Sequence, residues 1–308
     1  MSNSGIEAPV PDSSDKKQDT QPAKVDSSID PLSLMKERIP QDTSASSTSS
    51  SLPDLKLGDS NPPTQASSTN KNLEMGNPSN ATTDLSNKDN YLFTKDQYAM
   101  SYNSDHKTPN WVSWQLDKDW LGPQGRSGPF VPDPNLPAGF GKATPEDYIN
   151  SGYDRGHNCP SADRTKSLAD NEATFNMSDI APQAPDNNRG PWEKLEGYSR
   201  DLAKKGDELY VISGNEGSKG TIGAGVNVPQ TWFKVIVDLP QKGMGAKDVT
   251  DKTNIIAVEM PNQNGIKNDD WRKYETTMGA IEQHTGLQFL SNVPQDIRKA
   301  LEDKKYSA

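Results

Sequence analysis

The first ninety residues of the chain contain no aromatic side chain. All 6 Trp, 9 Tyr and 6 Phe residues follow Asn90, as do the 3 His residues and the single Cys. A segment rich in Ser, Asp, Pro, Asn and Thr that lacks aromatic residues buries too little apolar surface to offset the entropy lost on ordering. We therefore predict a disordered tail or linker over residues 1–90 and one folded domain over residues 91–308, which is long enough for a substantial core.

Charge and cysteine content narrow the range of functions. The whole chain carries a formal net charge of -10, and residues 91–308 hold 25 basic and 30 acidic side chains. A mildly acidic domain does not attract nucleic acid through its net charge, so phosphate binding requires a local basic groove or a metal ion. A single cysteine excludes an internal disulfide and a cysteine-rich zinc site.

The sequence leaves two cellular locations open. It contains no apolar run as long as a membrane span and no hydrophobic signal peptide at its start. These features fit an intracellular protein with a polar tail. They equally fit an extracellular or periplasmic protein whose export signal or lipid anchor is missing from this sequence.

Beyond residue 90, strand and helix patterns follow one another without a regular βαβ alternation. Strand patterns occupy residues 90–103, 108–122, 207–215, 226–239 and 252–263. Helix patterns occupy residues 144–152, 270–286 and 294–305, besides a longer helix near residues 190–206. This order predicts an α+β domain built on an antiparallel or mixed sheet.

The clearest helix lies between Pro191 and Gly206, which suit the first position and the C-terminal end of a helix. The apolar residues of its buried face recur at helical spacing: Trp192, Leu195, Tyr198 and Leu202. Asn188 and Glu196 lie eight positions apart at the start of this segment. If both residues are helical, about 80° of rotation separates them, so we expect both to face one cavity.

A second group of reactive side chains lies in the segment GYDRGHNCPSADR, residues 152–164. Asp154, Arg155 and His157 surround one glycine there. Histidine exchanges protons near neutral pH, and glycine permits a tight turn or the close approach of a ligand. Oxygen ligands from Asn188 and Glu196 suit Mg²⁺, and a histidine base with Mg²⁺ and arginines suits phosphodiester hydrolysis. Each residue alone has an ordinary structural explanation, such as helix capping, so the ordered combination carries the inference.

The segments GYDRGHNCPSADRT and TFNMSDIAPQAPDNNRGPWEKLE together resemble the DNA/RNA non-specific endonuclease family, most of all its secreted cyanobacterial members. The resemblance continues through LYVISG, VPQTWFKVIVDL, IIAVEMPNQNGI and IEQHTGLQFLSNVP, and covers nearly all of residues 91–295. It implies a ββα-metal (His-Me finger) nuclease domain with a central, mostly antiparallel sheet. In that motif one strand carries Asp-Arg-Gly-His, a second strand follows, and a helix carries the metal ligand.

The resemblance implies a catalytic role for four residues. His157 matches the general base that activates the attacking water. Arg126 and Arg155 match the two arginines that face the scissile phosphate. Asp154 matches the first position of the motif, where the side chain fixes the local geometry and the surroundings of the metal.

The resemblance also implies a cofactor, a substrate and a partner. Asn188 matches the sole protein ligand of Mg²⁺ or Mn²⁺, and Glu196 matches the helix glutamate that holds a water of the coordination shell. The implied activity is hydrolysis of DNA and RNA to 5′-phosphate and 3′-hydroxyl ends, with an extracellular or periplasmic location and a protein inhibitor as a further partner. The alternatives are a catalytically inactive nucleic-acid-binding module of the same fold and a phosphodiesterase restricted to small nucleotides.

The motif departs from the family pattern at two positions. Asn158 and Cys159 stand where the family usually has a small apolar residue followed by alanine. We expect Cys159 to be buried as a near-isostere of alanine, with a nucleophilic or zinc-binding role as the alternative. Asn158 lies next to the predicted base, and the sequence leaves open a hydrogen bond that perturbs it.

Overall fold

The computed structural model describes residues 70–306. The greater part of the predicted tail, residues 1–69, lies outside the described residues, so the division into a tail and a domain stays a prediction. The described part begins 21 residues before the expected start of the domain at residue 91. Met75 and Ala81 are buried, and the Asn72 side chain donates hydrogen bonds to the carbonyls of Lys95 and Asp96.

The expected start of the domain at residue 91 is therefore wrong, because residues 70–90 belong to the fold. Aromatic content did not mark the start of the domain, because this stretch packs through methionine, alanine and asparagine side chains. Its backbone also joins the sheet, where Thr82 forms a bridge with Tyr91.

A six-stranded sheet forms the centre of the domain, and every pairing within it is antiparallel. Its strand order is β1-β2-β3-β6-β9-β10. The strands are β1 (Tyr91–Thr94), β2 (Ala99–Asn103), β3 (Thr108–Leu116), β6 (Glu208–Glu216), β9 (Thr231–Leu239) and β10 (Asn254–Pro261). The predicted α+β fold with a mostly antiparallel central sheet is thus confirmed.

Two antiparallel pairs of short strands, called hairpins below, lie outside this sheet. One pairs β4 (Asp154–His157) with β5 (Ile180–Gln183), and the other pairs β7 (Thr221–Ile222) with β8 (Val226–Asn227). The first hairpin contains the Asp-Arg-Gly-His motif. It is followed directly by the helical segment that contains Asn188, so the order strand, strand, helix implied by the family resemblance is present.

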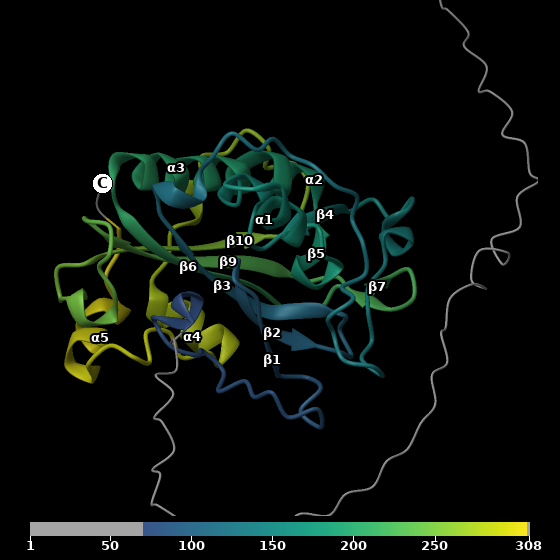
Figure 1. Cartoon of the computed structure of the whole chain (residues 1–308), viewed down its shortest axis with the longest axis horizontal. Helices are drawn as coiled ribbons and strands as arrows, with labels where there is room; N and C mark the ends of the chain where they lie inside the picture. The colour runs from purple at the N-terminus through teal and green to yellow at the C-terminus, as the bar shows by residue number, and fades with distance from the viewer. Residues whose placement is uncertain (1–69, 307–308) are drawn as a thin grey trace, which may run out of the picture. The chain divides into compact units, whose positions relative to one another are not determined.

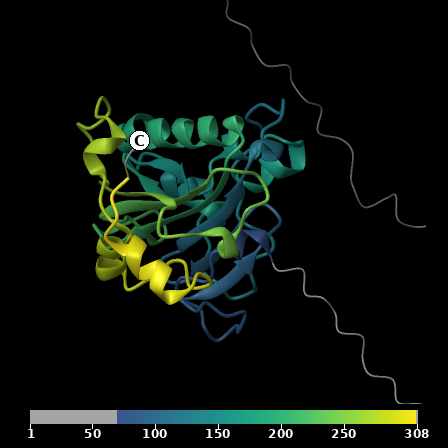
Figure 2. The ribbon, with the colours of Figure 1, turned by 90° about the vertical axis from the view of Figure 1, so that its left-hand side faces the viewer.

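Helices cover both faces of the central sheet, as Figure 1 shows and as the rotated view in Figure 2 repeats. Helix α3 (Glu193–Lys205) lies on one face, and α4 (Met278–Thr285) and α5 (Gln295–Glu302) lie on the other. The shorter helices are α1 (Leu168–Ala173) and α2 (Pro185–Asn187). Among the helices of the described residues, none is long and apolar enough to cross a membrane.

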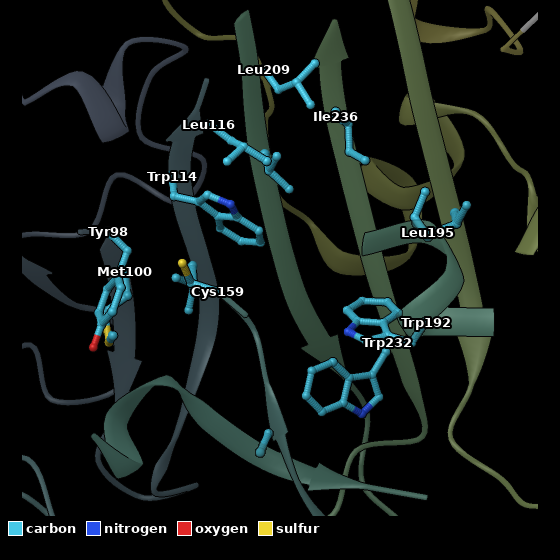
Figure 3. Close-up of a cluster of buried hydrophobic side chains, with 14 of the residues drawn as sticks. Tyr98, Met100, Trp114, Leu116, Cys159, Trp192, Leu195, Leu209, Trp232 and Ile236 are labelled. Carbon is cyan, nitrogen blue, oxygen red and sulfur yellow. The ribbon is translucent and has the colours of Figure 1, made fainter. Parts of the chain in front are cut away.

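Alternation along β9 divides the core into two layers. Trp232 and Ile236 pack on the α3 side with Trp192, as Figure 3 shows, whereas Phe233 and Val235 pack on the α4 side. Successive side chains of a strand point to opposite faces of its sheet, so even-numbered β9 residues face the layer under α3. Lys234, the one charged residue in the middle of this strand, therefore faces the α3 side.

The helix predicted over residues 270–286 is shorter than expected. Residues Trp271–Tyr274 form a single 3₁₀ turn, Glu275 then pairs with Val258 of β10, and α4 begins only at Met278. The Thr277 side chain caps α4 by accepting from the amide of Ala280. The predicted end is correct, because Gly286 adopts the left-handed conformation directly after the last helical residue.

Candidate active site

The β4–β5 hairpin positions His157. His157 lies opposite Ile180 and Gly156 lies opposite Ala181 in the antiparallel register. A Cβ atom at Gly156 would lie 3.0 Å from the Trp232 ring and would collide with the Gln183 side chain. The glycine of the motif is therefore required by the close packing of the hairpin on the central sheet.

His157 is buried in an aromatic pocket, with 8% of its surface exposed. Its ring centroid lies 5.4 Å from those of Phe130 and Phe175. Among the described residues, the buried Nε2 atom has no hydrogen-bond partner. Burial, and to a lesser extent the positive charge of Arg126, together lower the pKa of His157 to about 3. The imidazole is consequently neutral at neutral pH and able to accept a proton.

Asn188 and Glu196 do not share one regular helix. Asn188 begins a wide π-type turn, Asn188–Trp192, and α3 starts only at Glu193. Within this turn, Arg189 and Gly190 have non-helical dihedral angles, with φ -131° and ψ -115° at Gly190. The calculation of 80° between the two side chains is therefore wrong, since it assumes a continuous helix.

The two side chains nevertheless line the same cavity of about 270 Å³. Five of the six predicted site residues line it together: Arg126, Arg155, His157, Asn188 and Glu196. A larger cavity of about 670 Å³ lies elsewhere and contains no arginine in its lining. Cavity size alone therefore does not select a candidate site, whereas the convergence of a histidine, oxygen donors and cations favours the smaller cavity.

Asp154, the sixth predicted residue, holds the side chain of Asn188. The Asp154 Oδ2 atom accepts a hydrogen bond of 2.9 Å from Nδ2 of Asn188. The same carboxylate pairs with the guanidinium of Arg189 through both oxygens. Because the amide nitrogen is occupied by Asp154, the amide oxygen of Asn188 is the atom left to act as a ligand.

The two predicted arginines rest on aromatic rings. The guanidinium carbon of Arg126 lies 4.9 Å from the centroid of Phe175, and that of Arg155 lies 5.3 Å from the centroid of Phe130. Arg155 also donates a hydrogen bond of 2.9 Å to the carbonyl of Pro145. The same two phenylalanines thus position both the predicted base and the predicted cations, and sequence reasoning missed them.

A buried polar cluster beneath Glu196 was also missed. Lys234 is 1% exposed, its Nζ lies 3.7 Å from Oε1 of Glu196, and it sits 4.2 Å from the centroid of Trp192. Arg200 lines the cavity and pairs with Asp163 at 3.0 Å. Burial raises the pKa of the Glu196 carboxyl, while the charges of Lys234 and then Arg200 oppose that rise.

Sequence signals for this cluster existed. Arg200 lies four positions after Glu196 on α3, so the two share a face of the helix. Lys234 is the single basic residue within the apolar strand pattern TWFKVIVDL. An unpaired lysine in a buried strand is costly, so a partner carboxylate is expected.

The residues after His157 have structural contacts. Cys159 is fully buried in the core beneath the hairpin and is a free thiol, and burial raises its pKa well above the ordinary value. Asn158 donates to the carbonyl of Asp179 and accepts from the hydroxyl of Ser213. The expectation that Cys159 is buried is confirmed, and Asn158 ties the end of β4 to its neighbours.

Comparison with known proteins gives consistent matches. A family model described as DNA/RNA non-specific endonuclease matches residues 75–296. A nuclease of Nostoc sp. is 48% identical over 233 residues, which make up 75% of this chain and 85% of that protein. The mitochondrial nuclease EXOG of Homo sapiens is 30% identical over 218 residues, or 65% of this chain and 58% of that protein. The chain thus spans somewhat more than half the length of this mitochondrial relative.

A solved structure shares the architecture. The EndoG/EndoGI complex, described as revealing the mechanism of EndoG inhibition, matches with a TM-score of 0.61 and 26% sequence identity. The match covers 73% of this chain and 92% of that chain.

Proposed function

The chain belongs to the DNA/RNA non-specific endonuclease family, and we propose that its endonuclease activity is the metal-dependent hydrolysis of both DNA and RNA in the cavity between β4 and α3. The observation that carries this proposal is the convergence of His157, Asn188, Glu196 and two arginines on that cavity. Nucleases of this family are generally metal-dependent.

His157 is proposed as the general base. A neutral imidazole takes the proton of the attacking water, which requires a pKa below the working pH. Its low pKa makes the ring a weak base in the free protein. A bound phosphate brings negative charge close to Arg126 and offsets that arginine's effect, so substrate binding raises the pKa of His157 and strengthens the base.

The residues present fit a hard divalent cation. The amide oxygen of Asn188, fixed through Asp154, and the carboxylate of Glu196 are oxygen donors of the kind that Mg²⁺ and Mn²⁺ prefer. We propose Asn188 as the direct ligand and Glu196 as the partner of a coordinating water. Such an ion supplies positive charge for the transition state and the leaving 3′ oxygen, which gives 5′-phosphate and 3′-hydroxyl ends.

Arg126 and Arg155 are proposed to bind the scissile phosphate. Four arginines line the cavity, but Arg189 is paired with Asp154 and Arg200 with Asp163. Within residues 70–306, neither Arg126 nor Arg155 has a carboxylate within ion-pair distance. Their charge is therefore available for phosphate oxygens.

This phosphate-directed arrangement supports low sequence preference. The aromatic rings beside the base, Phe130 and Phe175, already pack against His157 and the arginines. Contacts to the phosphate backbone carry no direct base information. DNA and RNA present the same phosphodiester group, so both fit such a site. An extracellular or periplasmic location and a protein inhibitor that covers the cavity stay proposals on the basis of the family.

The test is cleavage of plasmid DNA and of RNA with Mg²⁺, with EDTA, and with a His157→Ala variant. We expect the native protein to degrade both polymers and EDTA to abolish this. His157→Ala should reduce the rate by about 10²–10⁴-fold, as loss of a general base does. His106 is exposed and does not line the cavity, so His106→Ala is the matched control and should keep native activity.

Three outcomes would contradict the proposal. Native activity in His157→Ala would exclude the base assignment, and no degradation by the native protein would favour a binding module. Asn188→Ala should require more metal for half-maximal activity. Native metal affinity and native rate in that variant would exclude Asn188 as the ligand.

A further inference from the structure

Three potential metal ligands meet on the sheet face opposite α3. Glu216 ends β6, Glu259 lies on β10, and His284 lies in the last turn of α4. On β10, Ile255 and Ala257 belong to the core layer under α4, so Glu259 faces that side by alternation. On β6, Tyr210 and Ile212 also belong to the core layer under α4, so Glu216 faces the same side by alternation. This triad, Glu216, Glu259 and His284, is therefore separated from the nuclease cavity by the sheet itself.

The donor atoms of the triad are already close together. One atom from each side chain lies within 4.8 Å of the other two. Nδ1 of His284 lies 3.0 Å from Oε2 of Glu259. Two ligands on a tetrahedral Zn²⁺ with bonds of about 2.0–2.1 Å are separated by roughly 3.3 Å, so small side-chain rotations suffice to bring all three to one ion.

Local charge also favours a cation at the triad. The 3.0 Å separation suits a simple ion pair of His284 with Glu259, but that pair leaves Glu216 uncompensated. Among the described residues, Glu216 has no lysine or arginine within ion-pair distance. The C-terminal end of α4, where His284 lies, adds the negative end of the helix dipole.

We propose that Glu216, Glu259 and His284 form a second metal site that binds Zn²⁺ or a similar transition-metal ion. One imidazole and two carboxylates suit such an ion better than Mg²⁺, which prefers an all-oxygen shell with several waters. Glu216 and His284 also line the cavity of about 670 Å³, so a fourth position faces that cavity and is open to water or a small anion.

The site links three elements that are separate in the sequence. An ion held by the triad connects the end of β6, the middle of β10 and the end of α4. An ion that binds only to the folded state stabilises that state by an amount that grows with the logarithm of the ion concentration above its dissociation constant. The metal therefore acts on stability and leaves the nuclease chemistry on the other face unchanged.

The test is a Zn²⁺ titration of the full chain by calorimetry in excess Mg²⁺, which occupies the nuclease cavity. We expect one Zn²⁺ equivalent for the native protein and at least about tenfold weaker binding for Glu216→Gln and for His284→Gln. His106→Gln is the control for an exposed histidine, and Asn188→Ala is the control for Zn²⁺ at the nuclease cavity. Both should bind Zn²⁺ as the native protein does.

A thermal unfolding measurement accompanies the titration. Zn²⁺ should raise the Tm of the native protein and of Asn188→Ala, and at the same Zn²⁺ concentration should raise that of Glu216→Gln clearly less. Both triad variants should keep native cleavage of plasmid in Mg²⁺, which shows that they fold. No Zn²⁺ binding by the native protein, or binding lost in Asn188→Ala and kept in both triad variants, would overturn the proposal.

Discussion

Replacing Gly190 by alanine tests how the turn before α3 positions Asn188. Gly190 packs directly against the backbone of Lys267, and an added Cβ would lie 2.7 Å from both its Cα and its carbonyl oxygen. Favourable contacts between carbon atoms lie at about 3.5–4.0 Å, so the segment at Gly190 or the segment at Lys267 must move away by about 1 Å. No side-chain rotation relieves the collision because both contacted atoms are backbone.

The expected cost follows from overpacking, which costs about 1–3 kcal/mol. A shift of about 1 Å in a turn that positions a catalytic group costs as much as 100-fold in rate. Since Asn188 lies two residues away in the same turn, we expect a rise in the Mg²⁺ concentration needed for half-maximal cleavage.

Gly197→Ala is the matched control on the adjoining helix. A Cβ at Gly197 meets only the end of the Arg200 side chain, at 3.9 Å, and alanine is favoured over glycine in a helix by about 1 kcal/mol. Urea unfolding should therefore show Gly190→Ala destabilised and Gly197→Ala unchanged or stabilised. If Gly190→Ala unfolds at the native urea concentration and keeps the native Mg²⁺ dependence, the turn does not constrain Asn188 as argued.

Two further predictions concern buried titratable groups. Because folding lowers the pKa of His157 to about 3, the unfolded chain binds the extra proton between pH 3 and about 6.5. The associated stability is complete above pH 6.5 and is lost as the pH falls, so His157→Gln should flatten the pH dependence of the urea midpoint in this window. Lys234→Met should destabilise by about 3–5 kcal/mol because Glu196 loses its nearest cation. Adding Glu196→Gln should recover part of that loss, and an unchanged urea midpoint in the single variant would exclude the pairing.

The sequence predicted which residues line the candidate cavity better than it predicted their local conformation. Arg126 lies 29 positions before Arg155 in a loop rich in proline and glycine, and only the family resemblance connected the two. Asn188 and Glu196 were expected to share a cavity, and they do. The expectation of one continuous helix from Asn188 to Glu196 was wrong, because the chain leaves the helical path at Gly190, where it passes the backbone of Lys267.

The remaining differences arise from long-range packing, which local patterns do not contain. Residues 70–90 were predicted to be part of the tail because they lack aromatic side chains, yet Met75 and Ala81 lie in the core layer under α4. Phe130 occupies an irregular segment with no strand or helix pattern, and its role appears only when His157 lies beside it. The predicted helix over residues 270–286 was too long because Glu275 pairs with β10 instead.

The acidic composition and a polyanionic substrate are compatible because of where the charges pair. Around the cavity, Arg189, Arg200 and Lys234 each have a carboxylate partner, so they shape the site without adding net positive charge. Arg126 and Arg155 are held instead by aromatic rings, which support a guanidinium without neutralising it. In the proposed mechanism, these two cations supply the unpaired positive charge at the reacting phosphate. On that proposal, a chain of net negative charge selects phosphodiesters by local geometry and has no need of a broad basic surface.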